Sequence, residues 1–178
     1  SAADTSRRER WRELVAHRDD VLVAGFDVFD NFLAIEERVE GLRKIRIRPW
    51  AGGPEFHIDS EEPAYRMALD ANEEVASEVV RYTYTSLTTP RTTYDYDIRT
   101  GERVLLKREP VLGDFDPSRY ATEYLWVPAR DGERVPVAIV YRRDLFGRDG
   151  TAPLLQYGYG AYGISSDPVF SSSLLSLL

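Results

Sequence analysis

Alternation of apolar and polar residues with a period of two is the feature that most restricts the fold of this sequence. Lys44-Ile-Arg-Ile-Arg48 places two isoleucines on one side and three cations on the other. Val80-Arg-Tyr-Thr-Tyr-Thr85 and Thr93-Tyr-Asp-Tyr-Asp-Ile98 repeat the pattern with valine, isoleucine and tyrosine on the apolar side. Successive side chains of a strand point to opposite faces, and β-branched and aromatic residues pack well there. These stretches therefore predict half-buried β-strands.

Turn-forming residues separate the expected strands. Arg99-Thr-Gly-Glu102 predicts a hairpin that leads into Arg103-Val-Leu-Leu-Lys107. Short strands at such spacing are typical of a sandwich, a barrel or a propeller, and a propeller would need about 40 to 50 residues per blade. Successive blades show no visible similarity, so periodicity alone leaves these architectures open. One short helix is expected from Ser6 to Ala16.

The character of the sequence changes after Glu109. Residues 110–119 are rich in turn formers and predict a linker. Beyond the linker, two alternating stretches over 123–129 and 134–141 flank Asp131-Gly132, the dipeptide that a type I′ turn prefers. A second hairpin is therefore expected.

The Gly-rich segment Gly158-Tyr-Gly-Ala-Tyr-Gly163 follows Leu154-Leu-Gln-Tyr157, an apolar stretch of the kind that forms a buried parallel strand. On the residues alone three interpretations are open. The segment matches the G-x-G-x-x-G of dinucleotide-binding turns through Gly158, Gly160 and Gly163. Its bulky tyrosines and Pro168, which interrupts the helix that should follow, argue against that match. The segment also suits an oxyanion loop of an α/β-hydrolase, or a packing turn without a catalytic role.

Composition excludes several classes of function. The 178 residues are 43% hydrophobic and 30% charged, as in an ordinary globular protein. A net charge of -7 argues against nucleic acid as a partner. The sequence has no cysteine, which removes disulfides and thiolate metal sites and suits the cytoplasm, where we expect the protein to act. No apolar run approaches the ~20 residues of a membrane span, so no membrane partner is expected, and neither is a metal or other cofactor.

Several motifs together resemble the prolyl oligopeptidase family of serine peptidases, and within it the oligopeptidase B branch. Gln156-Tyr-Gly-Tyr-Gly-Ala-Tyr-Gly163 is similar to the first motif of the family's catalytic domain. The other motifs are spread along the chain over 36–41, 81–90, 97–103, 129–136 and 170–173. The resemblance implies a mainly β chain. Residues 1–109 would hold the last blades of a seven-bladed β-propeller, 110–119 a linker, and 120–178 the truncated start of an α/β-hydrolase domain.

The resemblance also implies a function. The chain would be a fragment of a serine oligopeptidase that hydrolyses short peptides after arginine or lysine through an acyl-enzyme. Its partners would be short, basic peptides and the remainder of its own catalytic domain. A non-catalytic, β-rich binding or scaffold module is the alternative. Both ends are expected to be cuts. Because no G-x-S-x-G occurs, the catalytic triad is expected beyond Leu178 and the chain by itself is expected to be inactive.

Three residues carry the implied site. Tyr159 matches the family's oxyanion-hole tyrosine, whose hydroxyl would donate to the tetrahedral intermediate. Tyr162 would form part of the wall of the substrate pocket. Asp167 matches the first of two acids that help to bind a basic substrate residue, and Val169 stands in place of the second, which argues against a strong dibasic preference. The alternative for Asp167 is a turn residue before Pro168.

Overall fold

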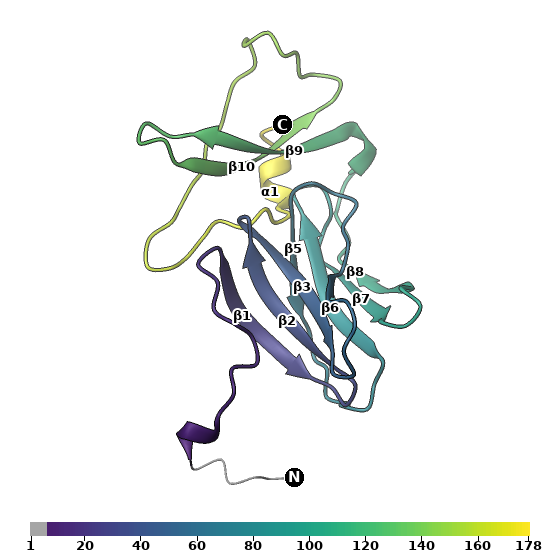
Figure 1. Cartoon of the computed structure of the whole chain (residues 1–178). Coiled ribbons are helices and arrows are strands. Elements are labelled where there is room, and N and C mark those ends of the chain that lie inside the picture. Colours follow the sequence, from purple (N-terminus) through teal and green to yellow (C-terminus); the bar gives the residue numbers. More distant parts are fainter. Residues whose placement is uncertain (1–6) are drawn as a thin grey trace.

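Two four-stranded antiparallel meanders occupy residues 21–108 (Figure 1). The structure is a computed structural model that describes residues 7–178. The first meander consists of β1 (Val21–Val28), β2 (Phe32–Val39), β3 (Leu42–Pro49) and β4 (Phe56–His57). The second consists of β5 (Tyr65–Leu69), β6 (Val79–Ser86), β7 (Thr92–Asp97) and β8 (Arg103–Arg108). Each meander has the four strands of a propeller blade, so the mainly β propeller fold expected from the sequence is confirmed.

A single parallel bridge joins the two meanders. β3 and β5 pair in parallel, and only through Arg43 and Arg66. Every other strand pair of this sheet is antiparallel. The short β4 pairs with the other half of β3, at Arg46 and Ile47. The meanders are therefore separate units within one hydrogen-bonded sheet, held together mainly by the side chains between them.

Those side chains form one apolar core. The expected alternation is confirmed, because Ile45 and Ile47 on β3 and Val80 and Tyr82 on β6 are fully buried. Burial raises the pKa of Tyr82 to about 12, since the phenolate is disfavoured away from water. The other fully or almost fully buried core residues come from both meanders: Phe29, Phe32, Ala34, Leu42, Ile58, Tyr65, Met67 and Tyr84.

Glu37 carries a buried negative charge inside the first meander. Its carboxylate lies 2.7 Å from His57 Nε2, accepts a hydrogen bond from Arg46 Nε at 3.1 Å, and has Arg18 Nη2 at 3.4 Å. A buried charge is tolerated when it is both paired and hydrogen-bonded. The partners belong to β3, to β4 and to the segment before β1, so one carboxylate holds these three elements together.

Glu62 has a similar role in the connection between the two meanders. Its carboxylate accepts hydrogen bonds from four hydroxyls: Tyr84 at 2.6 Å, Ser86 at 2.5 Å, Thr88 at 2.6 Å and Thr89 at 2.8 Å. These hydroxyls belong to the end of β6 and to the turn before β7. Burial, together with the bond to Glu62, raises the pKa of Tyr84 above its usual value. The turn is thus bound to the connection that precedes β5.

The chain after residue 109 begins with an irregular stretch and a long hairpin. A short 3₁₀ helix, η2 (Pro117–Arg119), is capped by Asp116, whose side chain accepts from the backbone N–H of Ser118. The hairpin consists of β9 (Tyr120–Pro128) and β10 (Arg134–Arg142), and a single helical turn, α1 (Ser172–Leu175), lies near the end. The C-terminal segment returns between the hairpin and the meanders (Figure 1).

Both predicted hairpins form, but the second has a different turn from the one expected. β7 and β8 pair as predicted. In the β9–β10 hairpin only Gly132 of the Asp131-Gly132 pair has a positive φ, whereas a type I′ turn needs a positive φ at both positions. The backbone N–H of Ala129 bonds to the carbonyl of Glu133 at 2.7 Å, which leaves a three-residue loop with glycine in the left-handed position. The type I′ expectation was therefore wrong.

The helix expected from Ser6 to Ala16 is also wrong over the residues that the structure describes. Ser6 lies outside them, and the remainder contains one 3₁₀ turn, η1 (Arg8–Arg10). Trp11 and Leu14 are exposed, and Val15 is half-buried. A helix this short is marginal unless tertiary packing covers an apolar face, and of residues 7–16 only Val15 is partly buried.

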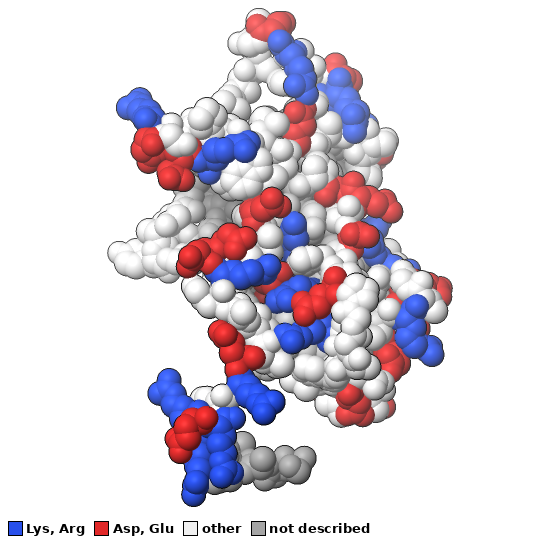
Figure 2. All heavy atoms as spheres, viewed as in Figure 1, with Lys and Arg blue, Asp and Glu red and all other residues white. Residues whose placement is uncertain are grey.

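Acidic and basic side chains are interleaved over the face of the molecule shown in Figure 2, from the hairpin to the lower ends of the strands. Over the strands and the hairpin this face carries no large patch of a single sign, whereas basic side chains gather at the N-terminal stretch at the lower left. Among the described residues, no helix is long and apolar enough to cross a membrane.

Removal of the Glu62 carboxylate tests its role in the fold. We expect Glu62→Ala to lower the free energy of unfolding by about 3 kcal/mol, because four hydroxyls lose a charged acceptor at once. Urea unfolding measures the change. Glu61→Ala, at the exposed neighbouring position, is the matched control and should change stability by less than about 0.5 kcal/mol. Equal effects of the two substitutions would show that the hydroxyl cluster contributes nothing specific.

Candidate active site

The β9–β10 hairpin is attached to the first meander at the turn between β2 and β3. Glu40 and Gly41 form this two-residue turn with φ angles of 53° and 82°, so it is here that a type I′ turn occurs. The Tyr124 hydroxyl of β9 donates to the Glu40 carbonyl at 2.7 Å. A Cβ at position 41 would collide with that hydroxyl and would lie 3.0 Å from the Pro136 ring. Glycine is therefore required both by the turn and by the contact.

The Gly-rich segment lies beyond this hairpin and forms no strand. Leu154, Leu155 and Tyr157 are exposed, and the structure has no ladder over 151–166. The buried parallel strand expected over 154–157 was therefore wrong. Such a strand needs hydrogen-bonding neighbours and covering helices, and the described part of the chain places none beside it.

Tyr159 and Tyr162 both point away from a packed interior. Tyr159 is 47% exposed, and its backbone N–H donates to Ser166 Oγ at 3.1 Å, which ties the segment to the chain that follows. Tyr162 has a φ of 57° and is 94% exposed. A left-handed tyrosine is unusual, and here it forms a turn closed by the backbone N–H of Ile164 bonding to the Ala161 carbonyl. Both phenol rings are thus available to a bound molecule.

The dinucleotide-binding interpretation is wrong. It requires a helix directly after Gly163, whose N-terminus would hold a pyrophosphate. The chain instead runs without helix from Ile164 to Ser171, and α1 is a single turn.

Asp167 is surrounded by arginines of the two meanders. Its Oδ1 lies 2.7 Å from Arg38 Nη2, and its Oδ2 lies 3.5 Å from Arg43 Nε and 3.4 Å from Arg66 Nε. The side chain is 13% exposed, and the neighbouring Pro168 is buried. The structure has no turn at this position, so the turn interpretation of Asp167 is wrong. The structure brings Asp167 to the propeller and leaves Tyr159 and Tyr162 on the exposed loop before it.

These arginines were not identified as site residues from the sequence. Arg43 precedes the alternating cations of 44–48 and falls on the isoleucine side of that strand, and Arg38 and Arg66 lie outside the alternating stretches. One signal pointed to them: Asp167 is the single acidic residue of 151–178, a stretch with no basic residue. An isolated charge in an otherwise neutral segment is expected to have a partner elsewhere.

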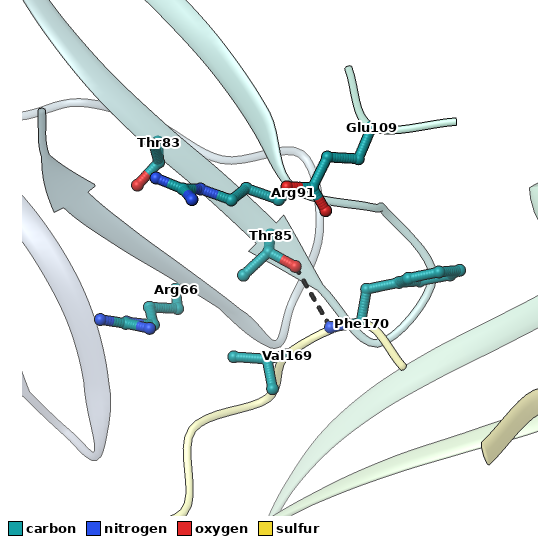
Figure 3. A pocket seen from close by; sticks show the side chains of 7 residues that line it. All are labelled: Arg66, Thr83, Thr85, Arg91, Glu109, Val169 and Phe170. Atoms are coloured by element: carbon teal, nitrogen blue, oxygen red, sulfur yellow. Dashed lines mark hydrogen bonds between the residues drawn. The ribbon is translucent and has the colours of Figure 1, made fainter. Parts of the chain in front are cut away.

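A cavity of about 300 Å³ lies where the C-terminal segment meets the second meander (Figure 3). The backbone N–H of Phe170 donates to Thr85 Oγ1 at 3.1 Å at its edge, and Val169 forms part of the wall. Arg66 and Arg91 extend from the opposite side, with Glu109 as the one acidic residue in the lining. The full lining is Arg66, Thr83, Thr85, Arg91, Glu109, Val169 and Phe170. The cavity therefore has a cationic wall beside Val169.

Phe170 also packs against the linker. Its ring meets the Phe115 ring edge-on at a centroid distance of 5.2 Å, and Phe115 stacks on Tyr120 at 5.6 Å. The end of the C-terminal segment is thus held by charge at Asp167, by a hydrogen bond at Phe170 and by aromatic packing.

Within the described residues, no group of three or more histidines, aspartates or glutamates is arranged to hold a metal ion.

Comparison with known proteins gives a consistent result. A family model described as prolyl oligopeptidase, N-terminal beta-propeller domain, matches residues 1–109. Dipeptidyl aminopeptidase BI of Pseudoxanthomonas mexicana is 49% identical over 98% of this chain and 24% of its own length. Protease 2 of Moraxella lacunata is 36% identical over 96% of this chain and 23% of its own length.

A solved structure shows the same arrangement. The closed form of oligopeptidase B from Trypanosoma brucei, with covalently bound antipain, has a TM-score of 0.79 at 28% identity. The match covers 92% of this chain and 24% of that protein. The chain thus spans about a quarter of the length of the relatives that it matches.

The contact between the hairpin and the first meander can be tested at Gly41. We expect Gly41→Ala to destabilise the protein by about 1 to 3 kcal/mol more than Gly52→Ala, because only the former adds a collision to the cost of a positive φ. Gly52 is a matched control, since its φ is 84° and an added Cβ would meet nothing within 4 Å. Urea unfolding followed by tryptophan fluorescence measures both losses. Equal losses would mean that the hairpin does not need this close approach.

Proposed function

The chain belongs to the prolyl oligopeptidase family of serine peptidases, and we propose that it is part of an enzyme that hydrolyses short peptides after arginine or lysine. One observation carries the proposal: at least 96% of the chain is similar to each of two proteins named as peptidases. The similarity therefore extends past the propeller residues into the Gly-rich segment. A propeller that covers the active site would admit short peptides and exclude folded proteins by size.

We propose that the chain contributes to the catalytic domain as well as to the propeller. Residues 120–178 would begin an α/β-hydrolase domain, with 110–119 as the linker. These 178 residues contain no G-x-S-x-G. The nucleophilic serine and its base would therefore be supplied by a further part of the enzyme, which is also the chief partner of this chain, and the chain by itself would not hydrolyse peptides.

Tyr159 is the proposed oxyanion-hole residue. Attack of a serine on the scissile carbonyl places negative charge on its oxygen, and a hydroxyl aimed at that oxygen stabilises the transition state more than the ground state. The half-exposed ring of Tyr159 and the bond from its backbone to Ser166 suit a hydroxyl that faces a reaction centre from an anchored loop. The exposed Tyr162 would contact the substrate beside it.

The charges around Val169 support a preference for one basic residue rather than two. By resemblance Asp167 is the acid that would recognise a cationic substrate side chain, but in this chain its carboxylate is already paired with Arg38, Arg43 and Arg66. Val169 replaces a second acid, and it lines a cavity to which Arg66 and Arg91 contribute positive charge. A second cationic residue entering this cavity would be repelled by these two guanidinium groups.

We propose that the enzyme acts in the cytoplasm, which the absence of cysteine suits.

A second candidate activity is the release of dipeptides from the amino end of a peptide. It is favoured by the 49% identity to dipeptidyl aminopeptidase BI. The two activities share the acyl-enzyme chemistry and differ in whether the substrate needs a free α-amino group.

Tyr159→Phe in the complete enzyme tests the oxyanion role. We expect kcat to fall by about 10²- to 10³-fold with little change in KM, because the hydroxyl contact is made mainly in the transition state. Steady-state kinetics on an arginyl peptide measures both constants. Tyr157→Phe, on the same exposed segment, should leave both unchanged. An unaltered kcat in the Tyr159 variant would remove this residue from the mechanism.

A set of defined peptides tests the substrate preference. We expect the complete enzyme to cleave after a single arginine or lysine, and kcat/KM to be no higher when the preceding residue is also basic. Mass spectrometry of the products identifies the cleaved bonds, and the 178-residue chain serves as the inactive control. The same peptides with an acetylated amino end separate the two candidates, since a dipeptidyl aminopeptidase would lose activity on them. Cleavage that ignores basic residues would contradict the preference.

A further inference from the structure

Asp167 has an environment that suits a structural charge better than a free substrate-binding acid. It is the single charged residue of 151–178, and its side chain is mostly buried. The three guanidinium groups around it come from β2, β3 and β5, so both meanders contribute. A carboxylate removed from water needs such compensation, and here the compensation comes entirely from the propeller side.

The arginines need Asp167 as much as it needs them. Arg43 has a second partner, Glu36, whose Oε1 lies 2.5 Å from its Nη1. Arg66 has no other ion pair in the described part of the chain, and Arg38 donates a hydrogen bond to the Gly41 carbonyl at 2.7 Å. Without Asp167, three partly buried cations would share one acid. Three guanidinium groups gathered around one position repel one another when the carboxylate between them is absent. The cluster therefore favours the state in which the C-terminal segment is docked and Asp167 lies among the arginines.

We propose that Asp167 is a latch that fastens the segment after the candidate oxyanion loop to both propeller blades, with Arg38, Arg43 and Arg66 as its receptor. Asp167 is a positioning residue in this role. It holds Pro168 in a buried site and brings the backbone N–H of Phe170 onto Thr85 Oγ1. Through Ser166, which accepts from the Tyr159 backbone, the latch also limits where Tyr159 lies.

The consequence for Tyr159 rests on the proposed function, whereas the latch itself does not. A latch made of ion pairs weakens as salt screens them, since the Debye length falls from about 10 Å at 0.1 M to about 3 Å at 1 M. A latch also neutralises the carboxylate, so a cationic substrate side chain would have to displace arginines in order to reach it. Loss of a substrate-binding acid would therefore raise KM for cationic substrates alone, whereas loss of the latch would affect all substrates alike.

Hydrogen exchange in the complete protein tests the latch without reference to activity. The reporter is the peptide covering residues 165–171, which contains the Phe170 amide. We expect Asp167→Asn to exchange at least about tenfold faster there than the wild type at 0.1 M NaCl, because a charged partner of buried groups is lost. The wild type should approach the variant as NaCl rises to 1 M, and Asp167→Glu should keep most of the protection.

Two arginine variants act as matched controls. Arg66→Gln, which removes one receptor, should lose part of the protection. Arg91→Gln removes a guanidinium that lines the same cavity but forms no ion pair with Asp167, so it should lose none. Unchanged exchange in Asp167→Asn would overturn the latch. Equally accelerated hydrogen exchange in peptides from β6 would also overturn the latch, because Asp167 would then support the fold in general.

Kinetics of the same variants separates the latch from the substrate acid. For a latch, Asp167→Asn changes kcat/KM by the same factor for arginyl and neutral peptides. A rise in KM confined to arginyl peptides would overturn the latch in favour of a substrate-binding acid. If the protein hydrolyses no peptide at all, the proposed function fails, and the exchange experiment still decides the latch.

Discussion

A carboxylate withdrawn from water must be matched by cations or hydrogen-bond donors, and this requirement determines how the separate parts of the chain are joined. Glu37 joins the N-terminal stretch to the first meander, Glu62 joins the connection between the meanders to the β6–β7 turn, and Asp167 joins the C-terminal segment to both meanders. Each junction lies where the chain is too irregular to bury a continuous apolar face. Several charged or hydroxyl partners around one carboxylate provide the specificity that packing cannot supply there.

The candidate active-site loop depends on these junctions. The strands hold Arg38, Arg43 and Arg66 near one another because β2, β3 and β5 are hydrogen-bonded neighbours in one sheet. The loop that carries Tyr159 has no ladder of its own and is tied down by Ser166 and by the docking of Asp167, Pro168 and Phe170. Catalytic groups on loops need such a support, since an oxyanion donor is effective only when it is already in place. The propeller therefore serves as the base on which the proposed catalytic segment is assembled.

The charges around this segment extend to the cavity beside it. Arg66 pairs with Asp167 and faces the cavity that Val169 lines, whereas Arg91 faces the cavity without an ion pair to Asp167. Arg66 thus links the ion pairs of Asp167 to the cavity, so a change in the charge at either place alters the other.

The sequence by itself determined the strands and the family. Period-two alternation around Ile45, Ile47, Val80 and Tyr82 identified the buried faces, because successive side chains of a strand point to opposite faces of the sheet. The combined motifs identified the prolyl oligopeptidase family. Local patterns failed where the outcome depends on distant neighbours: the stretch at 154–157 has no strand beside it, and the Asp131-Gly132 turn follows the register of its hairpin. Only the tertiary structure placed Asp167 among three arginines, because ion pairs between segments far apart in the chain leave no periodic trace in the sequence.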